Sequence, residues 1–556
     1  MPEATATSQT LDVEETELAE RAKKLGIALL SVIPRELDKT ILALIPEDTA
    51  RRYQMVPFKK TKSALSIAMV DPEDYEALNV LRFLAEKEHI TIQITLVSKK
   101  IFAEIAKYYT SADIALRDAI VSLKKNADEN IQGTARQSRE GVAVEGFQDA
   151  PIANLVETIV QKSIDGRASD IHIEPIENNF RVRFRVDGIL QSQLIFPIEI
   201  GRAVIARIKI LANLKIDEKR KPQDGRFQFD KQDGTSIDLR VSSLPVVEGE
   251  KIVMRVLDKS ANSTDMEELG LWGRNRTVLE KRIQEPYGVV LLTGPTGSGK
   301  TTTLYSFLQT LNKEDRNIVT LEDPVEYYVE GINQSQIKPE IGYTFASGLR
   351  SILRQDPNVI MVGEIRDVET AELVIHAALT GHLVFSTLHT NDALGSIPRL
   401  IDMGMEPFLL ASALQVVAAQ RLVRRLCEHC KEEFFPSPEQ EKYIRELFEA
   451  IPLEEIVAFG FDKKQEMVFA RGKGCEKCNQ SGYKGRIAIY EVIEVDNIMR
   501  AIISDKKGNE GETRQAAINQ GMTTMKQNGI LVALKKITSL EEIERVTQGS
   551  ILVDEE

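Results

Sequence analysis

The chain has 556 residues, which is too long for one hydrophobic core and predicts three or four domains. Its formal net charge of −13 argues against broad nucleic-acid binding, which needs a basic footprint. No apolar run approaches the roughly 20 residues that span a bilayer, and the acidic N-terminus shows no secretory signal, so a cytoplasmic protein is expected.

The first quarter of the chain is predicted to be a small α/β module between two polar segments. Residues 1–20 are expected to be a flexible N-terminus, and residues 111–150 have the composition of a linker. Between them, in residues 21–110, ALSIAMVDP and ITIQITLV alternate like strands, whereas EALNVLRFLAEK and KKIFAEIAKYY carry helical spacing.

A second α/β unit is predicted over residues 151–262. PIANLVETIVQKSIDGRASD has the spacing of a helix, and NFRVRFRVDGILQ alternates like one strand with a polar face. The helix GRAVIARIKILANL leads to a basic turn, KIDEKRKPQDGR, and two more strands are expected around Leu239 and Val253. The basic turn has no aromatic side chains on which bases could stack, so we expect no nucleic-acid contact there.

From residue 265 to residue 556 buried strands alternate with helices, which predicts a parallel α/β domain. YGVVLLTGPTGSGKTTTLYSFLQTL supplies a strand, a glycine-rich loop and a helix, the full context of a phosphate-binding loop. Its glycines let backbone N–H groups converge on phosphate oxygens, its lysine is expected to reach the β- and γ-phosphates, and its first threonine is expected to ligate Mg²⁺. The predicted nucleotide-binding residues are Gly294, Pro295, Thr296, Gly297, Ser298, Gly299, Lys300, Thr301 and Thr302.

Three long motifs follow the loop, and together with it they resemble the ATPases of type IV pilus assembly and type II secretion. TLEDPVEY resembles the aspartate box of this family, GLRSILRQDPNVIMVGEIRD its Walker B region and TGHLVFSTLHTND its histidine box. The match extends from Pro151 to the C-terminus. It implies a RecA-like P-loop NTPase core, preceded by a PAS-like α/β domain and a small N-terminal α/β domain.

ATP hydrolysis calls for two carboxylates, one near the metal and one that polarises the attacking water. Many Walker B strands end in an aspartate, and Gly363 occupies that place here, as in the family. The resemblance therefore implies that Glu364 holds Mg²⁺ through its water shell and helps to orient the water, which leaves Glu322 as the expected general base. The alternative is that Glu322 and Asp323 form a solvated turn before Pro324.

His382 and His389 bracket the strand LVFSTL. Their odd offset would place them on opposite faces of a regular strand, which argues against a shared metal site. Family position implies that both histidines sense the nucleotide, whereas for His376 a structural role is equally open.

Four arginines are candidates to neutralise the transferring phosphoryl group. Arg226 in QDGRFQF and Arg240 in IDLRVSSLP match positions of catalytic arginines in the secretion ATPases, and Arg350 and Arg354 share a predicted helix face. In oligomeric ATPases a neighbouring subunit commonly supplies this charge, so the resemblance implies a homohexamer. Ordinary surface ion pairs are the alternative interpretation.

All four cysteines of the chain lie in two C-x-x-C pairs. Two such pairs are the ligand set of a tetrahedral, structural Zn²⁺ site, here in a subdomain that spans residues 427–478. A redox pair or idle thiols are the alternatives, and His429 inside the first pair offers another ligand. The set also matches the tetracysteine motif of the assembly and secretion ATPases. The predicted zinc ligands are Cys427, Cys430, Cys475 and Cys478.

The resemblance implies an ATP hydrolase that needs ATP, Mg²⁺ and Zn²⁺. It implies a cytoplasmic ring, peripheral to the inner membrane, that drives pilin polymerisation through an inner-membrane platform protein. Tyr490 before Glu491 favours pilus assembly over type II secretion, and a nucleic-acid translocase or a non-hydrolysing ring member are further alternatives.

Residues 21–110 resemble the N-terminal module of the same ATPases. Some relatives bind cyclic di-GMP through this module and an extra Arg-Leu-Gly-rich helical segment. That segment is absent here, so cyclic di-GMP binding is doubtful, and docking to a membrane-associated protein is the favoured role of the module.

Overall fold

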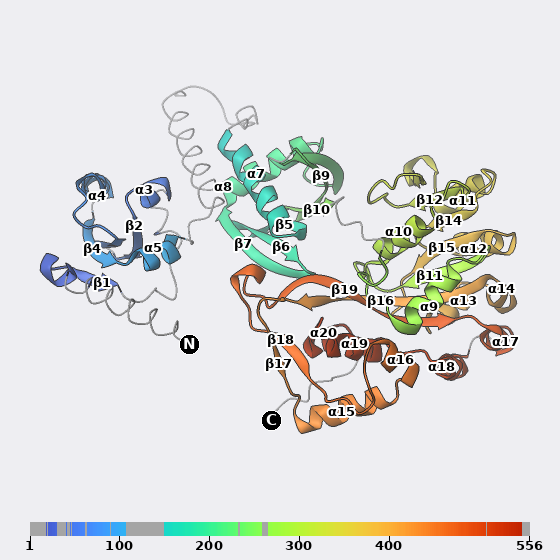
Figure 1. The fold of residues 1–556 in the computed structure, drawn as a ribbon. Coiled ribbons are helices and arrows are strands. Elements are labelled where there is room, and N and C mark those ends of the chain that lie inside the picture. The colour runs from blue at the N-terminus through green and yellow to red at the C-terminus, as the bar shows by residue number, and fades with distance from the viewer. Residues whose placement is uncertain are drawn as a thin grey trace. The chain divides into compact units, whose positions relative to one another are not determined.

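The computed structural model describes residues 18, 21–30, 41, 45, 47–61, 64–88, 90–106, 150–231, 234–257, 265–506 and 509–547. The predicted flexible N-terminus and linker lie almost entirely outside these residues. The chain divides into two compact units, residues 1–256 and residues 257–556 (Figure 1). Within the described residues, no helix combines the length and the apolar character that crossing a membrane requires.

The first described region of the first unit is a four-stranded sheet with the order β1-β4-β3-β2. β1 and β3 run parallel to β4, whereas β2 runs antiparallel to β3. Both strands and both helices predicted for this region are confirmed. The elements are β1 (Ala28–Leu30), α3 (Glu47–Arg52), β2 (Met55–Lys60), β3 (Ala64–Met69), α4 (Tyr75–Glu88), β4 (Thr91–Val97) and α5 (Lys99–Ala106).

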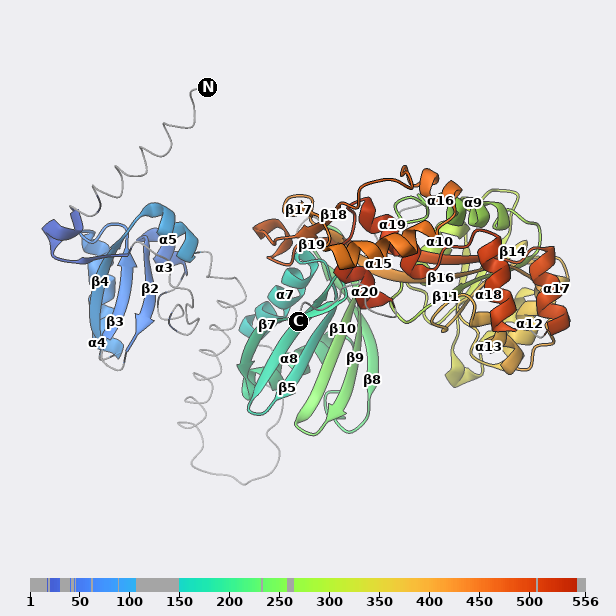
Figure 2. The same ribbon diagram turned by 90° about the horizontal axis from the view of Figure 1, so that it is seen from below.

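A six-stranded sheet follows in the same unit, with the order β7-β6-β5-β10-β9-β8 (Figure 2). Alternation along its strands sends Ile171 and Ile173 into the core that α7 and α8 share, and sends Asp170, His172 and Glu174 to the opposite face. The elements are α7 (Ala150–Asp165), β5 (Ala168–Ile176), β6 (Asn179–Val186), β7 (Ile189–Pro197), α8 (Ile198–Leu211), β8 (Gln223–Asp230), β9 (Ser236–Val246) and β10 (Gly249–Leu257).

Three predictions in this unit are wrong in detail. The first helix ends at Asp165, and the rest of its predicted segment enters β5. The single strand NFRVRFRVDGILQ is a hairpin, because Asp187 and Gly188 both adopt positive φ, as a two-residue turn between twisted strands requires. The predicted basic turn ends before Gln223, where β8 begins, so the QDGR segment belongs to a strand.

The second unit is built on a seven-stranded sheet with the order β13-β12-β14-β15-β11-β16-β19. The first six strands are parallel, and β19 pairs antiparallel with β16. Successive residues of β11, Leu291 and Leu292, enter different apolar cores, so both faces of the sheet are covered. The strands are β11 (Gly288–Thr293), β12 (Ile318–Glu322), β13 (Asn333–Gln336), β14 (Val359–Val362), β15 (Leu383–Leu388), β16 (Leu414–Leu426) and β19 (Tyr483–Glu494).

Helices surround this sheet, and a two-stranded sheet of β17 and β18 lies between β16 and β19 in the sequence. The first set is α9 (Gly273–Arg282), α10 (Lys300–Leu311), η1 (Pro339–Ile341), α11 (Phe345–Ile352), α12 (Val368–Leu379), α13 (Ser396–Asp402) and α14 (Pro407–Ala413). The second set is β17 (Lys431–Phe434), α15 (Pro438–Glu449), α16 (Leu453–Ala458), β18 (Phe469–Gly472), η2 (Glu476–Cys478), α17 (Asn497–Lys506), α18 (Glu510–Asn519), α19 (Met525–Leu534) and α20 (Leu540–Val546).

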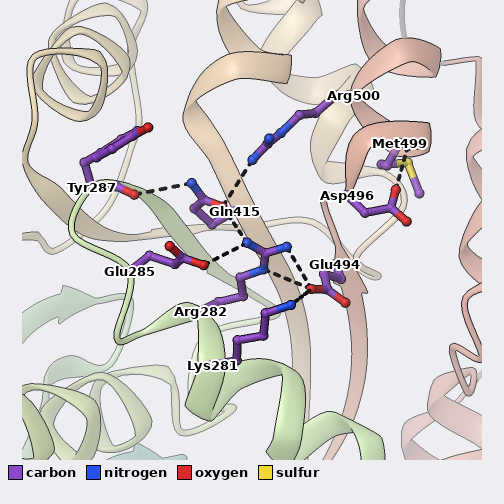
Figure 3. Close-up of polar contacts among 9 residues, drawn as sticks. All are labelled: Lys281, Arg282, Glu285, Tyr287, Gln415, Glu494, Asp496, Met499 and Arg500. Atoms are coloured by element: carbon purple, nitrogen blue, oxygen red, sulfur yellow. Dashed lines mark hydrogen bonds and ion pairs between the residues drawn. The ribbon is translucent and has the colours of Figure 1, made fainter.

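A charged cluster lies at the edge of the sheet where the parallel strands β11 and β16 begin (Figure 3). Arg282, at the end of α9, donates to Glu494 of β19 at 2.8 Å and to Gln415 of β16 at 3.1 Å. The same guanidinium donates to Glu285 at 3.1 Å, and Lys281 donates to Glu494 at 3.3 Å. The cluster therefore joins one helix to two strands at the edge that lies opposite the phosphate-binding loop.

Candidate active site

The phosphate-binding loop connects β11, which is buried along its whole length, to α10. Gly294, Gly297 and Gly299 adopt φ of 142°, 78° and 88°. A Cβ at Gly294 would lie 2.5 Å from the carbonyl oxygen of Gln420, so only glycine fits there. The Ser298 hydroxyl is buried without a hydrogen-bond partner among the described residues, as expected of a loop shaped to enclose phosphate oxygens.

Lys300 lies at the N-terminus of α10 and folds back over the loop. Its Nζ donates to the carbonyl oxygens of Gly294 at 2.8 Å and Pro295 at 3.1 Å. Burial lowers the pKa of Lys300 to about 8, against the opposing field of Glu364. The contacts of this buried ammonium group are neutral carbonyl oxygens, and phosphate oxygens would supply an anion to pair with it. The residues of the loop therefore fit a nucleoside triphosphate.

The carboxyl ends of three strands meet at the same edge as the loop. Glu364, two residues beyond β14, lies 3.1 Å from the Nε2 of His389, the residue that follows β15. Arg366 binds Glu364 and lies 3.6 Å from Asp323, which follows β12. The structure therefore brings two predicted residues together, and it adds Arg366 and Asp323, whose pairing across distant motifs the sequence does not reveal.

His382 lies at the other end of β15, away from the phosphate-binding loop of its own chain, and its nucleotide-sensing role stays a prediction. Its carbonyl oxygen accepts from Gly288, the first residue of β11, and its Nδ1 lies 2.9 Å from the Ala377 carbonyl oxygen. A strand rises about 3.3 Å per residue, so the two histidines lie roughly 20 Å apart along β15. Two residues that flank a strand lie at its opposite ends, whichever face of the sheet each one points to.

Glu322, the expected general base, is enclosed by hydrogen-bond partners, and its catalytic role stays a prediction. Only 2% of the residue is exposed, and its carboxylate accepts hydrogen bonds from Tyr305, from Thr320 at 2.6 Å and from Gln334 at 3.2 Å. Burial raises the pKa of Glu322, and these hydrogen bonds oppose the rise. The alternative of a solvated turn is wrong for Glu322. Because the Tyr305 hydroxyl also bonds to the backbone of Glu326, the buried carboxyl group holds the turn that follows β12.

Arg226 and Arg240 belong to the first unit, where the register of β8 and β9 places them directly opposite each other. Both arginines are exposed, and neither forms an ion pair with another residue that the structure describes. Like charges that face each other across two strands destabilise a sheet unless an anion binds them. By contrast, Arg183 on the same sheet contacts Glu174 at 2.7 Å. The opposed pair is therefore a candidate anion-binding site.

Arg350 and Arg354 fit the surface ion-pair interpretation. Arg350 pairs with Glu369 of α12, and Arg354, beyond the end of α11, donates to the Arg350 carbonyl oxygen at 2.8 Å. These contacts engage both guanidinium groups within the second unit.

The four cysteines form one cluster, in which all four sulfur atoms lie within 4.8 Å of one another. β16 ends one residue before Cys427, and β19 begins shortly after Cys478, so pairing of these two long strands brings the knuckles together. The Cys478 sulfur accepts backbone N–H groups from Cys475 at 3.2 Å and Gly482 at 3.3 Å, as suits a thiolate ligand. His429 is exposed beside Lys477 and lies outside the cluster. The donor set fits Zn²⁺.

Comparisons with known proteins agree with this geometry. Residues 145–545 match the family model described as type II/IV secretion system protein, and residues 25–115 match that of the MshEN domain. The type IV pilus assembly ATPase PilB of Myxococcus xanthus is 41% identical over 548 residues, which cover 97% of this chain and 92% of that protein. The type II secretion system ATPase E of Vibrio cholerae is 40% identical over 507 residues, which cover 91% of this chain and 97% of that protein.

The solved structures support the fold. The ATPase DotB of Legionella pneumophila has a TM-score of 0.51 at 22% sequence identity, over 70% of this chain and 94% of that one. This likeness confirms the predicted mixed α/β architecture with a RecA-like core. Because the family model spans most of the chain and the relatives match over nearly their whole length, the chain belongs to the type II/IV secretion system protein family, a family of ATPases.

Proposed function

We propose that this protein is a cytoplasmic, homohexameric ATP hydrolase that couples hydrolysis to type IV pilus assembly. The observation that carries the proposal is the meeting of the phosphate-binding loop with Glu364, Arg366 and His389 at one edge of the sheet. That edge offers backbone donors and a lysine to bind phosphates, and a carboxylate to bind a metal. Transfer of a phosphoryl group to water requires these groups.

In this proposal residues 294–302 bind the phosphates and Thr301 and Glu364 hold Mg²⁺, which neutralises charge on the β- and γ-phosphates when bound. Glu364 also orients the attacking water, because the Glu322 carboxylate is enclosed and already bonded to Tyr305. His389 fixes the Glu364 carboxylate from β15. Glu322 contributes indirectly, by holding the turn after β12 through Tyr305.

Arg226 and Arg240 are proposed to reach the nucleotide of a neighbouring subunit. Their mutual repulsion would be relieved by the γ-phosphate, and the stabilisation would increase as charge shifts in the transition state. A subunit in isolation would then be incomplete, and the family resemblance supports a homohexameric ring.

The direction of work rests on relatives whose names include type IV pilus assembly. The motor is proposed to act on an inner-membrane platform protein, with residues 21–110 docking to a membrane-associated protein and Zn²⁺ bracing residues 427–478. Type II secretion is the second candidate, because secretion ATPases match equally well. With a net charge of −13 we propose no nucleic-acid partner, and we propose no cyclic di-GMP ligand.

Subunit mixing tests the shared site. Lys300→Ala removes the loop lysine, Arg226→Ala removes the arginine, and each variant alone should hydrolyse little ATP. Mixed rings should regain activity, because some sites then combine an intact loop with an intact arginine. Native mass spectrometry of the same samples should show six chains with six zinc ions. Mixed rings that stay inactive would contradict the shared site.

A chromosomal Lys300→Ala variant separates the two directions of work. Loss of surface pili with protein export intact supports pilus assembly, whereas loss of export with pili intact supports secretion. Electron microscopy of cells and gels of the culture medium measure the two outcomes.

A further inference from the structure

Glu491 is a buried carboxylate in β19 whose two oxygens accept backbone N–H groups from different parts of the second unit. One donor is Ala393, at 3.1 Å, in the loop that follows β15. The other is Met525, at 3.2 Å, the first residue of α19. Glu491 therefore bridges the histidine-box loop and the first turn of a C-terminal helix.

The loop that Glu491 holds is tied directly to the nucleotide site. The Thr390 N–H donates to the Thr293 hydroxyl at 2.9 Å, and the two threonine hydroxyls lie 2.5 Å apart. Thr293 is the last residue before Gly294 and the phosphate-binding loop. One residue earlier in the histidine-box loop, His389 contacts Glu364 at 3.1 Å.

A carboxylate suits this position better than any neutral side chain of the same size. Burial raises the pKa of Glu491, and the N–H groups of Ala393 and Met525 oppose the rise. Two converging donors require two acceptor atoms. A glutamine supplies only one acceptor and would turn its NH₂ group toward the other donor.

β19 is itself fixed on both sides of Glu491, so the carboxylate has little freedom to move. The preceding residue, Tyr490, donates its backbone N–H to Asn528 of α19 at 3.0 Å, and its hydroxyl lies 3.2 Å from the Thr303 hydroxyl of α10. Farther along the strand, Glu494 belongs to the charged cluster around Arg282 (Figure 3). A rigid strand can therefore impose a position on the loop that it binds.

We infer that Glu491 is a positioning residue for ATP hydrolysis: it sets the histidine-box loop so that His389 and Thr390 meet Glu364 and Thr293. This inference rests on the proposed ATPase function. It assigns to the C-terminal strand a direct part in the geometry of the active site, through hydrogen bonds between residues that are 98 and 34 positions apart in the sequence.

Glu491→Gln in the full chain tests the inference by steady-state ATPase kinetics. We expect kcat to fall about tenfold while the KM for ATP changes less than about twofold, because the phosphate-binding loop keeps its own contacts and only the reacting geometry is displaced. Glu455→Gln is the matched control. Glu455 is also buried with a raised pKa and accepts one backbone N–H, from Arg274 at 2.7 Å, but it makes no recorded contact with the described histidine-box loop. It should lower the melting temperature and leave kcat within about twofold.

A kcat for Glu491→Gln close to that of the wild type would overturn the inference, as would an equal loss in the Glu455→Gln control. If Glu491→Gln does not fold, Asp392→Ala loosens the same loop from within, since Asp392 accepts from Gly395 at 2.8 Å. An unchanged kcat in that variant would overturn the inference, and a loss at constant KM would support it. Wild-type protein without Lys300-dependent hydrolysis would instead refute the proposed function.

Discussion

Both edges of the seven-stranded sheet carry an arginine bound to a carboxylate, yet solvent reaches the two arginines to very different extents. At the edge opposite the loop the Arg282 side chain is 12% exposed and its partner Glu494 is 20% exposed. At the loop edge the Arg366 side chain is 59% exposed, and it holds Glu364 and Asp323 from the outside. The same pair of residue types therefore serves two purposes in one sheet.

This difference in exposure decides which arginine can leave its carboxylate partner. Removal of one partner from an enclosed pair leaves a charge with poor solvation, which costs several kcal/mol. An arginine that water already reaches loses little solvation when its partner moves away. The cluster around Arg282 thus stabilises the sheet, whereas the Arg366 guanidinium keeps its contact with water when Glu364 turns to a metal ion.

The largest expected effect follows from Glu364→Gln at the exposed edge. We expect kcat to fall by about 10²–10³-fold, since the amide cannot hold Mg²⁺ or polarise water as a carboxylate does. Nucleotide affinity and melting temperature should stay close to those of the wild type. Steady-state ATPase assays, titration with a fluorescent nucleotide and calorimetry measure the three quantities. A large fall in melting temperature would show that this edge is structural after all.

A second enclosed cluster, around Glu542 of α20, extends the comparison to pH. Arg424 lies 2.6 Å from its carboxylate and Arg545 lies 2.8 Å from it. Burial alone would raise the pKa of Glu542, but hydrogen bonds from Arg545 and Arg424 hold it at about 2, below the usual 4.5. The folded protein therefore binds the proton less well than the unfolded chain. The resulting stabilisation, about 3 kcal/mol, is complete above pH ~4.5 and is lost as the pH falls toward 2.

Urea unfolding of the wild type and of Glu542→Gln at pH 7 and near pH 3 measures this effect. The variant should be less stable at pH 7 by roughly 3 kcal/mol. The gap should narrow near pH 3, because there the unfolded wild-type chain takes up a proton at Glu542 that the folded protein, with its pKa of about 2, does not bind. A gap of the same size at both values would mean that shape, and not charge, stabilises the site.

Arg282→Met tests the enclosed edge directly. We expect the free energy of unfolding to fall by about 2 kcal/mol, because Glu494 keeps its charge with little access to water, while kcat per folded molecule stays unchanged. Lys281→Met is the matched control, since its exposed ammonium group contacts the same Glu494 oxygen. That change should cost less than about 0.5 kcal/mol. Equal losses in both variants would remove the distinction between the edges.

Much of the fold and of the site could be predicted because the relevant patterns are local. The phosphate-binding loop and the two C-x-x-C pairs each occupy a short, ordered stretch, and buried strands alternate visibly with helices. Burial and pairing between distant segments were harder to predict. Glu322 stands in a charged motif but turns into a core that Tyr305 and Gln334 close from elsewhere in the sequence.

Register set similar limits on the prediction. Arg226 and Arg240 face each other only because β8 pairs with β9 in one register, and the sequence assigned the first of them to a turn. The contact between Glu491 and Ala393 joins residues 98 positions apart. Such contacts depend on the order of strands in the sheet, which periodicity within one segment does not encode.

The two histidines that bracket β15 offer the finest test, because one lies at each edge of the sheet. His389→Gln should lower kcat about tenfold, near 1.4 kcal/mol of barrier, since Glu364 loses the ring that fixes it. His382→Gln should leave kcat within about twofold. Its Nδ1 must donate to the Ala377 carbonyl oxygen, so its loss should cost about 1 kcal/mol of stability. ATPase assays and urea unfolding of both variants give the two readouts. A kcat loss in His382→Gln equal to that in His389→Gln would mean that the histidine at the far edge reaches a nucleotide in another subunit, and the functional contrast between the edges would then hold only within one chain.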